Sequence, residues 1–148
     1  GEAGSGPGQF DLVHGLAVDR EHRVYVADRR NNRVQVFTED GAFIEEWPDI
    51  TDPVGVFIDE HHAVWVISAS LHRLLKYSRD GELQHSWGAY GGPGGLAGGV
   101  FRPHQIDVDQ EGNVYVASWS GGWLNKFTPK PNADPNALIG GGLVLERR

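Results

Sequence analysis

Two of the seven histidines occupy corresponding places in the chain and are the residues whose chemistry is easiest to name. His14 begins the segment HGLAVD, and His104 begins the similar segment HQIDVD. A neutral imidazole nitrogen is a common ligand of divalent metals, and zinc is the metal most often held by histidine-rich sites. If the fold brings both rings together, they form part of a zinc site. The alternative is that both are structural histidines, held in place by hydrogen bonds.

Arg102 lies two residues before His104 and is the second candidate for chemistry. The planar guanidinium group carries N–H donors in a fork that matches a carboxylate or a phosphate. Arg102 is therefore our candidate catalytic residue, in the role of receiving an anionic part of the substrate. The alternative is an ordinary surface arginine.

Several other kinds of site are excluded by composition and motif. The chain has no cysteine, which rules out thiolate metal sites and cysteine nucleophiles. It has neither a Gly-x-Ser-x-Gly nor a His-Glu-x-x-His motif. Glu45 and Glu46 are adjacent, so on a strand they face opposite sides and cannot act as a glycosidase pair.

Charge and hydropathy narrow the range of partners. Lys and Arg number 13 against 20 Asp and Glu, which gives a net charge of −7. An acidic balance argues against a groove that follows a nucleic-acid backbone. No apolar run approaches the roughly 18 residues that a membrane-spanning helix needs. We therefore expect neither nucleic acid nor membrane as a partner.

The chain consists of three copies of one repeat. Similar segments recur 40 and then 50 residues apart and keep their register through each copy. The segments that begin the copies are HGLAVD at 14–19, VGVFID at 54–59 and HQIDVD at 104–109. The next segments are VYVAD at 24–28, VWVIS at 64–68 and VYVAS at 114–118. A fixed period of this length is typical of stacked repeat architectures.

Each repeat predicts four short β-strands. The segments are rich in Val, Ile, Tyr and Trp and are bounded by turn residues such as Asp-Gly. Four strands per roughly 40 residues is the period of a propeller blade. The prediction is an all-β, single-domain chain (1–148) with blades at about 7–47, 48–87 and 88–148. The nearly continuous apolar first segments predict strands buried on both faces, and 142–148 is the candidate fourth strand of the last blade.

Some recurring polar residues have a simpler structural interpretation. Asp19, Asp59 and Asp109 each precede a turn, so we expect them to be turn-forming residues. Arg33 and Arg73 occupy the same place in successive repeats, which favours a role in the blade over a role in catalysis.

The motifs GPGQF, HGLAVD, VYVADRRNNRVQVF and DGAF resemble NHL repeats, the unit of six-bladed propellers. Within that group, PGQF followed by His14 and by VADRRNNRVQVF is similar to peptidyl-α-hydroxyglycine α-amidating lyase. The segment FRPH at 101–104 resembles the last blade of that lyase. The resemblance spans about residues 4–130 and implies a six-bladed ring.

The resemblance also implies a metal site, although several residues of the lyase's site are replaced in this chain or lie outside it. The lyase family binds zinc through three channel histidines, and His14 and His104 match two of them, whereas the third belongs to a blade outside this chain. Val54 stands at the equivalent place in the middle repeat. Arg102 replaces a Met of the lyase, and Gln105 replaces an Asp that helps to hold calcium, so calcium is the less well matched cofactor. The lyase's catalytic Tyr and Arg lie in blades that this chain lacks.

Three blades of this type cover about half a ring and leave two apolar blade faces uncovered. Exposed apolar faces of that size indicate an interface. We expect a homodimer in which two copies close a six-bladed ring about a twofold axis. The alternatives are that the missing half lies in a removed part of the same gene product, or that this is a fragment that pairs differently.

The sequence therefore predicts a metal-dependent, lyase-like propeller, a zinc-dependent carbon–nitrogen lyase if it is an enzyme. A small molecule or peptide would bind at the channel mouth. The alternative is a non-catalytic NHL-repeat scaffold that binds a protein or ligand, or a self-assembling half-propeller without activity. The resemblance implies a secreted or periplasmic protein, but no signal segment opens this chain, so the compartment stays open.

Overall fold

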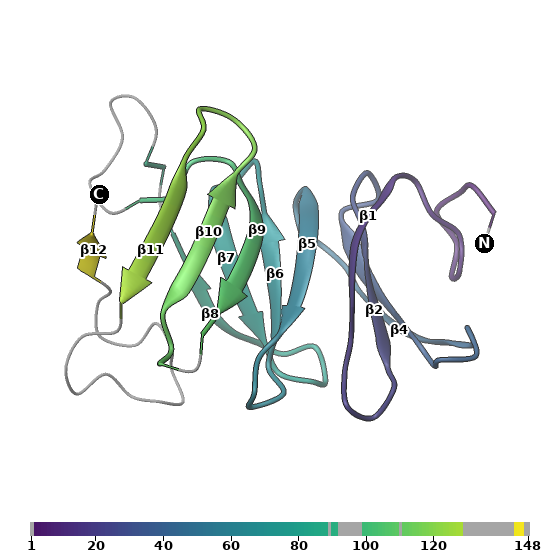
Figure 1. Cartoon of the computed structure of the whole chain (residues 1–148). Coiled ribbons are helices and arrows are strands. Elements are labelled where there is room, and N and C mark those ends of the chain that lie inside the picture. Colours follow the sequence, from purple (N-terminus) through teal and green to yellow (C-terminus); the bar gives the residue numbers. More distant parts are fainter. Residues whose placement is uncertain (1, 89, 92–98, 110, 129–143, 147–148) are drawn as a thin grey trace.

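The computed structural model describes residues 2–88, 90–91, 99–109, 111–128 and 144–146. These residues form three four-stranded antiparallel sheets, in each of which neighbouring strands are successive in the chain (Figure 1). The described part contains no helix, and so none that could span a membrane. The all-β prediction is therefore confirmed.

Each sheet corresponds to one repeat. The first sheet contains β1 (Val13–Val18), β2 (Val24–Asp28), β3 (Arg33–Phe37) and β4 (Phe43–Trp47). The second contains β5 (Pro53–Ile58), β6 (Val64–Ser68), β7 (Arg73–Tyr77) and β8 (Leu83–Trp87). The third contains β9 (Pro103–Val108), β10 (Val114–Ser118), β11 (Leu124–Thr128) and β12 (Val144–Glu146). The pairing of β12 with β11 supplies the fourth strand expected within 142–148.

The turn between the first two strands is built in the same way in every sheet. The carboxylate of Asp19 accepts hydrogen bonds from the backbone amides of Glu21 and Arg23 and from the hydroxyl of Tyr25. Asp59 and Asp109 accept the corresponding bonds in their own sheets. These bonds satisfy turn amides that no strand partner reaches, so the predicted turn-forming role is confirmed.

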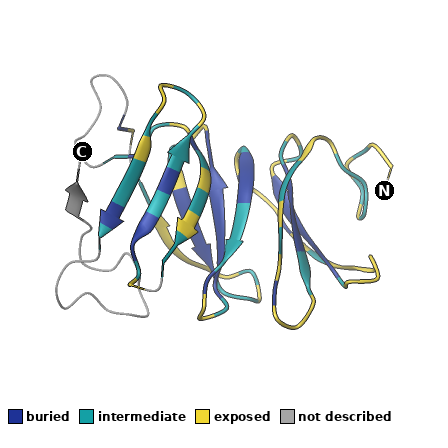
Figure 2. Cartoon of the chain, in the orientation of Figure 1, coloured by how far each residue is buried: buried dark blue, intermediate teal, exposed yellow. Residues whose placement is uncertain are grey.

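The core lies between the sheets, which stack side by side (Figure 1). One apolar cluster joins the first two sheets, with Trp47 and Tyr77 stacked at a ring distance of 5.4 Å. A second cluster joins the second and third sheets, with Trp87 edge-on to Phe127 at 4.6 Å. The middle sheet is thus covered on both faces, whereas each outer sheet has one face covered by another described sheet (Figure 2).

The burial predicted for the first strand of every repeat is wrong for β1 and β9. Leu16 is 60% exposed and Val18 is 53% exposed in β1, and exposed residues alternate with half-buried ones along most of β9. The physical reason is that burial on both faces needs a neighbouring sheet on both sides. Of the three first strands, β5 lies in the middle sheet and has both neighbours, whereas β1 and β9 lie in the outer sheets. Leu124 on the open face of the third sheet is 73% exposed, whereas its equivalent Leu74 is fully buried in the second.

Arg33 ties the segment before β1 to the first sheet. Its side chain is buried, donates to Asp28 and Glu46, and also donates to the backbone carbonyls of three residues of that segment, Ser5, Gly6 and Gln9. The equivalent Arg73 is exposed and donates to the hydroxyl of Ser86. A structural role for Arg33 is therefore confirmed, and the two equivalent arginines differ because only Arg33 meets a folded-back segment among the described residues.

Candidate functional site

The first strand of each sheet is irregular at one repeat position. The strand pairing shifts by one residue at His14 in β1, at Val54 in β5 and at His104 in β9. A bulge of this kind leaves the extra residue outside the ladder and re-aims its side chain. The three bulged residues are those that the repeat alignment places together, so the backbone presents them in the same way.

Two glycines let these three strands converge. A Cβ atom on Gly15 would lie 2.9 Å from the Cα atom of Gly55 and 2.9 Å from the carbonyl oxygen of Val54. A Cβ atom on Gly55 would lie 3.4 Å from the carbonyl oxygen of His104. Larger residues at these places would hold the strands apart. The glycines therefore allow β1 and β9 to approach each other across β5.

This convergence brings His14 and His104 together, although 90 residues separate them. Their ring centroids lie 5.0 Å apart with an interplanar angle of 79°. Nδ1 of His14 lies 2.6 Å from the carbonyl oxygen of Val54. Because a carbonyl only accepts, Nδ1 donates this bond, and in the neutral tautomer the lone pair is then on Nε2. Metal-binding histidines are commonly oriented by such a bond to a carbonyl.

Both rings line an open groove of about 380 Å³, which we call the histidine groove. Its lining residues are His14, Gly15, Leu16, Val54, Gly55, Val56, His104 and Gln105. Burial lowers the pKa of His104 below its ordinary value, and the nearby His14 and Arg29 lower it further. The His104 ring is therefore neutral at pH 7, with a lone pair available to an electrophile or a metal.

The histidine groove fits zinc only in part. Zinc sites usually have four ligands, and the two imidazoles are of the right type. Within the described residues, no group of three or more His, Cys, Asp and Glu side chains could hold a metal. Calcium fits less well, because it prefers six to eight oxygen ligands and the residues lining the groove include no carboxylate. Zinc and calcium binding both stay predictions.

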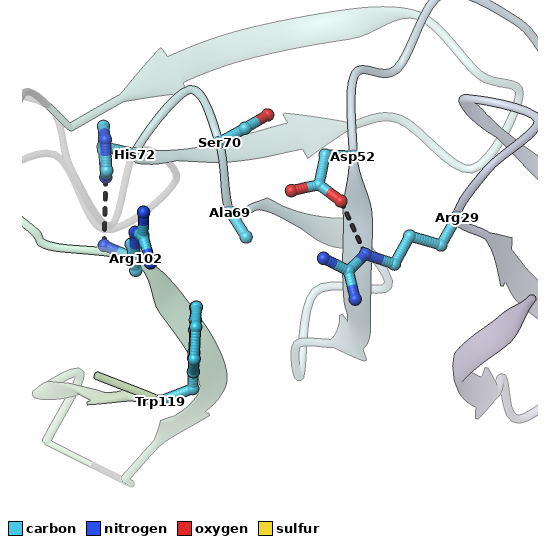
Figure 3. A pocket seen from close by; sticks show the side chains of 7 residues that line it. All are labelled: Arg29, Asp52, Ala69, Ser70, His72, Arg102 and Trp119. Carbon is cyan, nitrogen blue, oxygen red and sulfur yellow. Dashed lines mark hydrogen bonds and ion pairs between the residues drawn. The ribbon is translucent and has the colours of Figure 1, made fainter.

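Arg102 lines a different pocket of about 280 Å³, which we call the arginine pocket. Its lining residues are Arg29, Asp52, Ala69, Ser70, His72, Arg102 and Trp119. Figure 3 shows Arg102, His72 and Trp119 on one side and the Arg29–Asp52 pair on the other. The fold therefore brings the two histidines together and places Arg102 in a separate pocket beside them.

The backbone of Arg102 is held on both sides. Its amide donates to Nδ1 of His72 at 3.0 Å, and its carbonyl accepts from the amide of Trp119 at 3.4 Å. The His72 ring stacks on Phe101 at 5.8 Å. Burial lowers the pKa of His72, and the charge of Arg102 lowers it further. The guanidinium carbon of Arg102 lies 5.1 Å from the centre of the Trp119 ring.

Three other residues of this pocket were not among the site residues predicted from the sequence: Arg29, Asp52 and His72. The signal that finds them is the repeat alignment itself. Arg29, Ala69 and Trp119 share one repeat position, 40 and 50 residues apart, and Asp52 shares another with Arg102. Residues that share a repeat position lie at the same end of successive sheets, so chemically different residues there make one pocket.

Comparison with known proteins identifies the repeat. Residues 10–37 match the NHL repeat model. Protein lin-41 of Caenorhabditis elegans is 52% identical over 46 residues, which is 31% of this chain and 4% of that protein. Human NHL repeat-containing protein 3 is 46% identical over 48 residues, 32% of this chain and 14% of that protein. The matched segment thus spans a small part of the length of these relatives.

The fold has solved counterparts. The structure of virginiamycin B lyase from Staphylococcus aureus superposes with a TM-score of 0.62 at 15% identity, over 78% of this chain and 38% of that chain. At this identity the likeness concerns the fold alone. The predicted closeness to the amidating lyase stays a prediction. The chain has a β-propeller fold in which residues 10–37 form an NHL repeat.

Proposed function

We propose that this chain forms part of a metal-dependent, lyase-like site, with His14 and His104 as two ligands of a zinc ion in the histidine groove. The observation that carries the proposal is the 5.0 Å approach of two imidazoles from sheets that are not adjacent. The bulges that aim the rings share one repeat position, and the two glycines share the next one. Virginiamycin B lyase has the same fold, so a lyase activity is compatible with this fold.

Each histidine has a defined part in this proposal. The bond from Nδ1 of His14 to Val54 aims the lone pair of Nε2 away from the backbone. The lowered pKa of His104 keeps that ring unprotonated at neutral pH. A bound zinc ion would supply a Lewis acid that polarises an oxygen of the substrate. The remaining ligands and the base would come from outside the described residues or from the substrate.

Zinc titration by isothermal calorimetry tests the binding half of the proposal. We expect one bound zinc per histidine groove and a loss of affinity of at least tenfold in His14→Ala and in His104→Ala. His85→Ala is the matched control, because His85 lies on the exposed strand β8, away from the groove. Equal zinc affinity of the double variant and the unsubstituted protein would overturn the metal site.

Substrate turnover tests the catalytic half. A peptide that ends in α-hydroxyglycine should release glyoxylate in the presence of zinc, and His104→Ala should abolish the release while its circular dichroism stays unchanged. If zinc binds but no glyoxylate is released, the amidating-lyase assignment fails and the metal site stands.

A non-catalytic scaffold is the second candidate function. The specific observation in its favour is that the lining of the histidine groove offers two metal ligands and no carboxylate that could act as a base. Absence of both zinc binding and glyoxylate release would favour the scaffold.

A further inference from the structure

We propose that the arginine pocket binds the carboxylate of a small aromatic acid, with Arg102 as the residue that pairs with the anion. The site is distinct from the histidine groove and needs no metal. Three sheets contribute to it, because Arg29 follows β2, Asp52 precedes β5 and Arg102 precedes β9. Stacking of the sheets is therefore what completes the pocket.

The charge of the pocket favours a monoanion. Two arginines and one aspartate line it, and His72 accepts a hydrogen bond through Nδ1, so that ring is neutral in this arrangement. The lining thus has a charge of +1 in a chain of net charge −7. A carboxylate with one negative charge matches this lining, whereas the second charge of a phosphate would be repelled by Asp52.

The donors that would meet the ligand are available. Arg29 uses Nε for its bond to Asp52 at 2.6 Å, which leaves its terminal nitrogens without a hydrogen-bond partner among the described residues. Within the same part of the chain, Arg102 makes no ion pair, and its guanidinium lies over Trp119. Stacking on a ring leaves the N–H edges of a guanidinium group free to form two parallel bonds to a carboxylate.

The donors are also positioned before any ligand arrives. The backbone of Arg102 is bonded to His72 and Trp119. Asp52, which holds Arg29, is itself fixed by a bond from its amide to the side-chain oxygen of Asn32 at 2.9 Å. Groups that are already ordered cost less conformational entropy when they bind, so a small ligand can be held by few contacts.

The apolar part of the ligand follows from the remaining lining. Trp119 is 59% exposed and offers aromatic surface beside the cationic group, and Ala69 adds a small apolar side chain to the lining. At about 280 Å³ the pocket is at the small end of the usual range for ligand sites. A small acid with one aromatic ring would use both the guanidinium group of Arg102 and the aromatic surface of Trp119.

Calorimetric titration with N-benzoylglycine tests the proposal, and N-benzoylglycinamide is the matched probe without the charge. We expect the acid to bind at least tenfold more tightly than the amide and than inorganic phosphate. Equal affinity for acid and amide would overturn the proposal. Tighter binding of phosphate would overturn the assignment to a carboxylate.

Substitutions locate the binding. Arg102→Ala should weaken binding of the acid at least tenfold, and Arg102→Lys should retain only part of the affinity, because a lysine cannot form the paired bonds. Arg20→Ala is the control, since it removes the same charge from an exposed turn and should change nothing. Equal losses in Arg20→Ala and Arg102→Ala would show a general charge effect and overturn the site.

The result for the arginine pocket can be distinguished from the result for the proposed zinc site. Binding of N-benzoylglycine should survive a chelator and the His14→Ala substitution, because the pocket contains neither zinc ligand. Trp119→Ala should weaken the binding of N-benzoylglycine, and this test remains available if Arg102→Ala fails to fold. Full affinity in a folded Trp119→Ala variant would contradict the aromatic part of the assignment.

Discussion

Gly15 and Gly55 face each other so closely that a Cβ atom on the first would lie 2.9 Å from the Cα atom of the second. Real Cβ atoms essentially never approach other atoms so closely. The contact sets the spacing of β1 and β5, and it keeps His14 within hydrogen-bond distance of Val54. The geometry of the histidine pair therefore depends on two residues that carry no side chain.

We expect Gly15→Ala to destabilise the fold by roughly 1–3 kcal/mol, the usual cost of forcing an extra group into a packed contact. The added methyl group would also separate the His14 and His104 rings. Urea unfolding measures the first effect, and the proton–proton contact between the rings in NMR measures the second. Gly41→Ala is the control: its φ of 84° also makes a side chain costly, but nothing lies near it, so the ring contact should survive. Retention of the contact in Gly15→Ala would contradict this account.

The two equivalent arginines should respond very differently to substitution. Arg33→Ala leaves the buried Asp28 without its cationic partner, so we expect a loss of roughly 3–5 kcal/mol in the free energy of unfolding. Hydrogen exchange should also rise in the segment before β1. Arg73→Ala, at the exposed equivalent position, should change stability by less than about 0.5 kcal/mol. Similar losses in the two variants would show that the repeat position, and not the folded-back segment, sets the cost.

Stability should decline as the pH falls through about 6.5 and below, because of the half-buried His72 and His104. Burial lowers the pKa values of His72 and His104 in the folded state, whereas an unfolded chain has the ordinary value of about 6.5. The unfolded state therefore takes up protons first, so this stabilisation is complete above about pH 6.5 and is lost as the pH falls through the folded-state pKa values. Urea midpoints at several pH values measure the decline.

His72→Asn provides the control for this decline. The first sheet has Asn32 at the same repeat position with a φ of 53°, close to the 57° of His72, so the backbone should accept the change. The variant should show a smaller decline below about pH 6.5. An undiminished decline would rule out His72 as a contributor.

The open face of the third sheet should mediate assembly. Leu124 is 73% exposed, whereas its equivalents Val34 and Leu74 are fully buried between sheets. We expect native mass spectrometry to show a species of twice the 16.2 kDa chain mass, and Leu124→Glu to shift it toward one chain. Leu83→Glu is the control, because Leu83 is 55% exposed but lies on the outer strand β8. A monomer at micromolar concentration, or equal effects of the two substitutions, would refute the homodimer.

The sequence alone determined what depends on local pattern. Alternation of β-branched and aromatic residues with Asp-Gly turns predicts the strands, because strand and turn preferences are properties of a few neighbouring residues. Repetition of the pattern predicts three similar sheets. It also places His14 and His104 at one position, because equivalent residues in stacked repeats lie at the same end of the stack.

Tertiary structure decided what depends on neighbours in space. The pattern of β1 resembles that of β5, yet only β5 is covered on both sides, since burial requires a second sheet that the segment itself does not contain. Arg33 is buried and Arg73 is exposed for a similar reason, because the segment before β1 packs on Arg33. The arginine pocket joins residues from three sheets, so it is formed only when the repeats pack together. Contacts between distant segments create that site, and local preference carries no information about them.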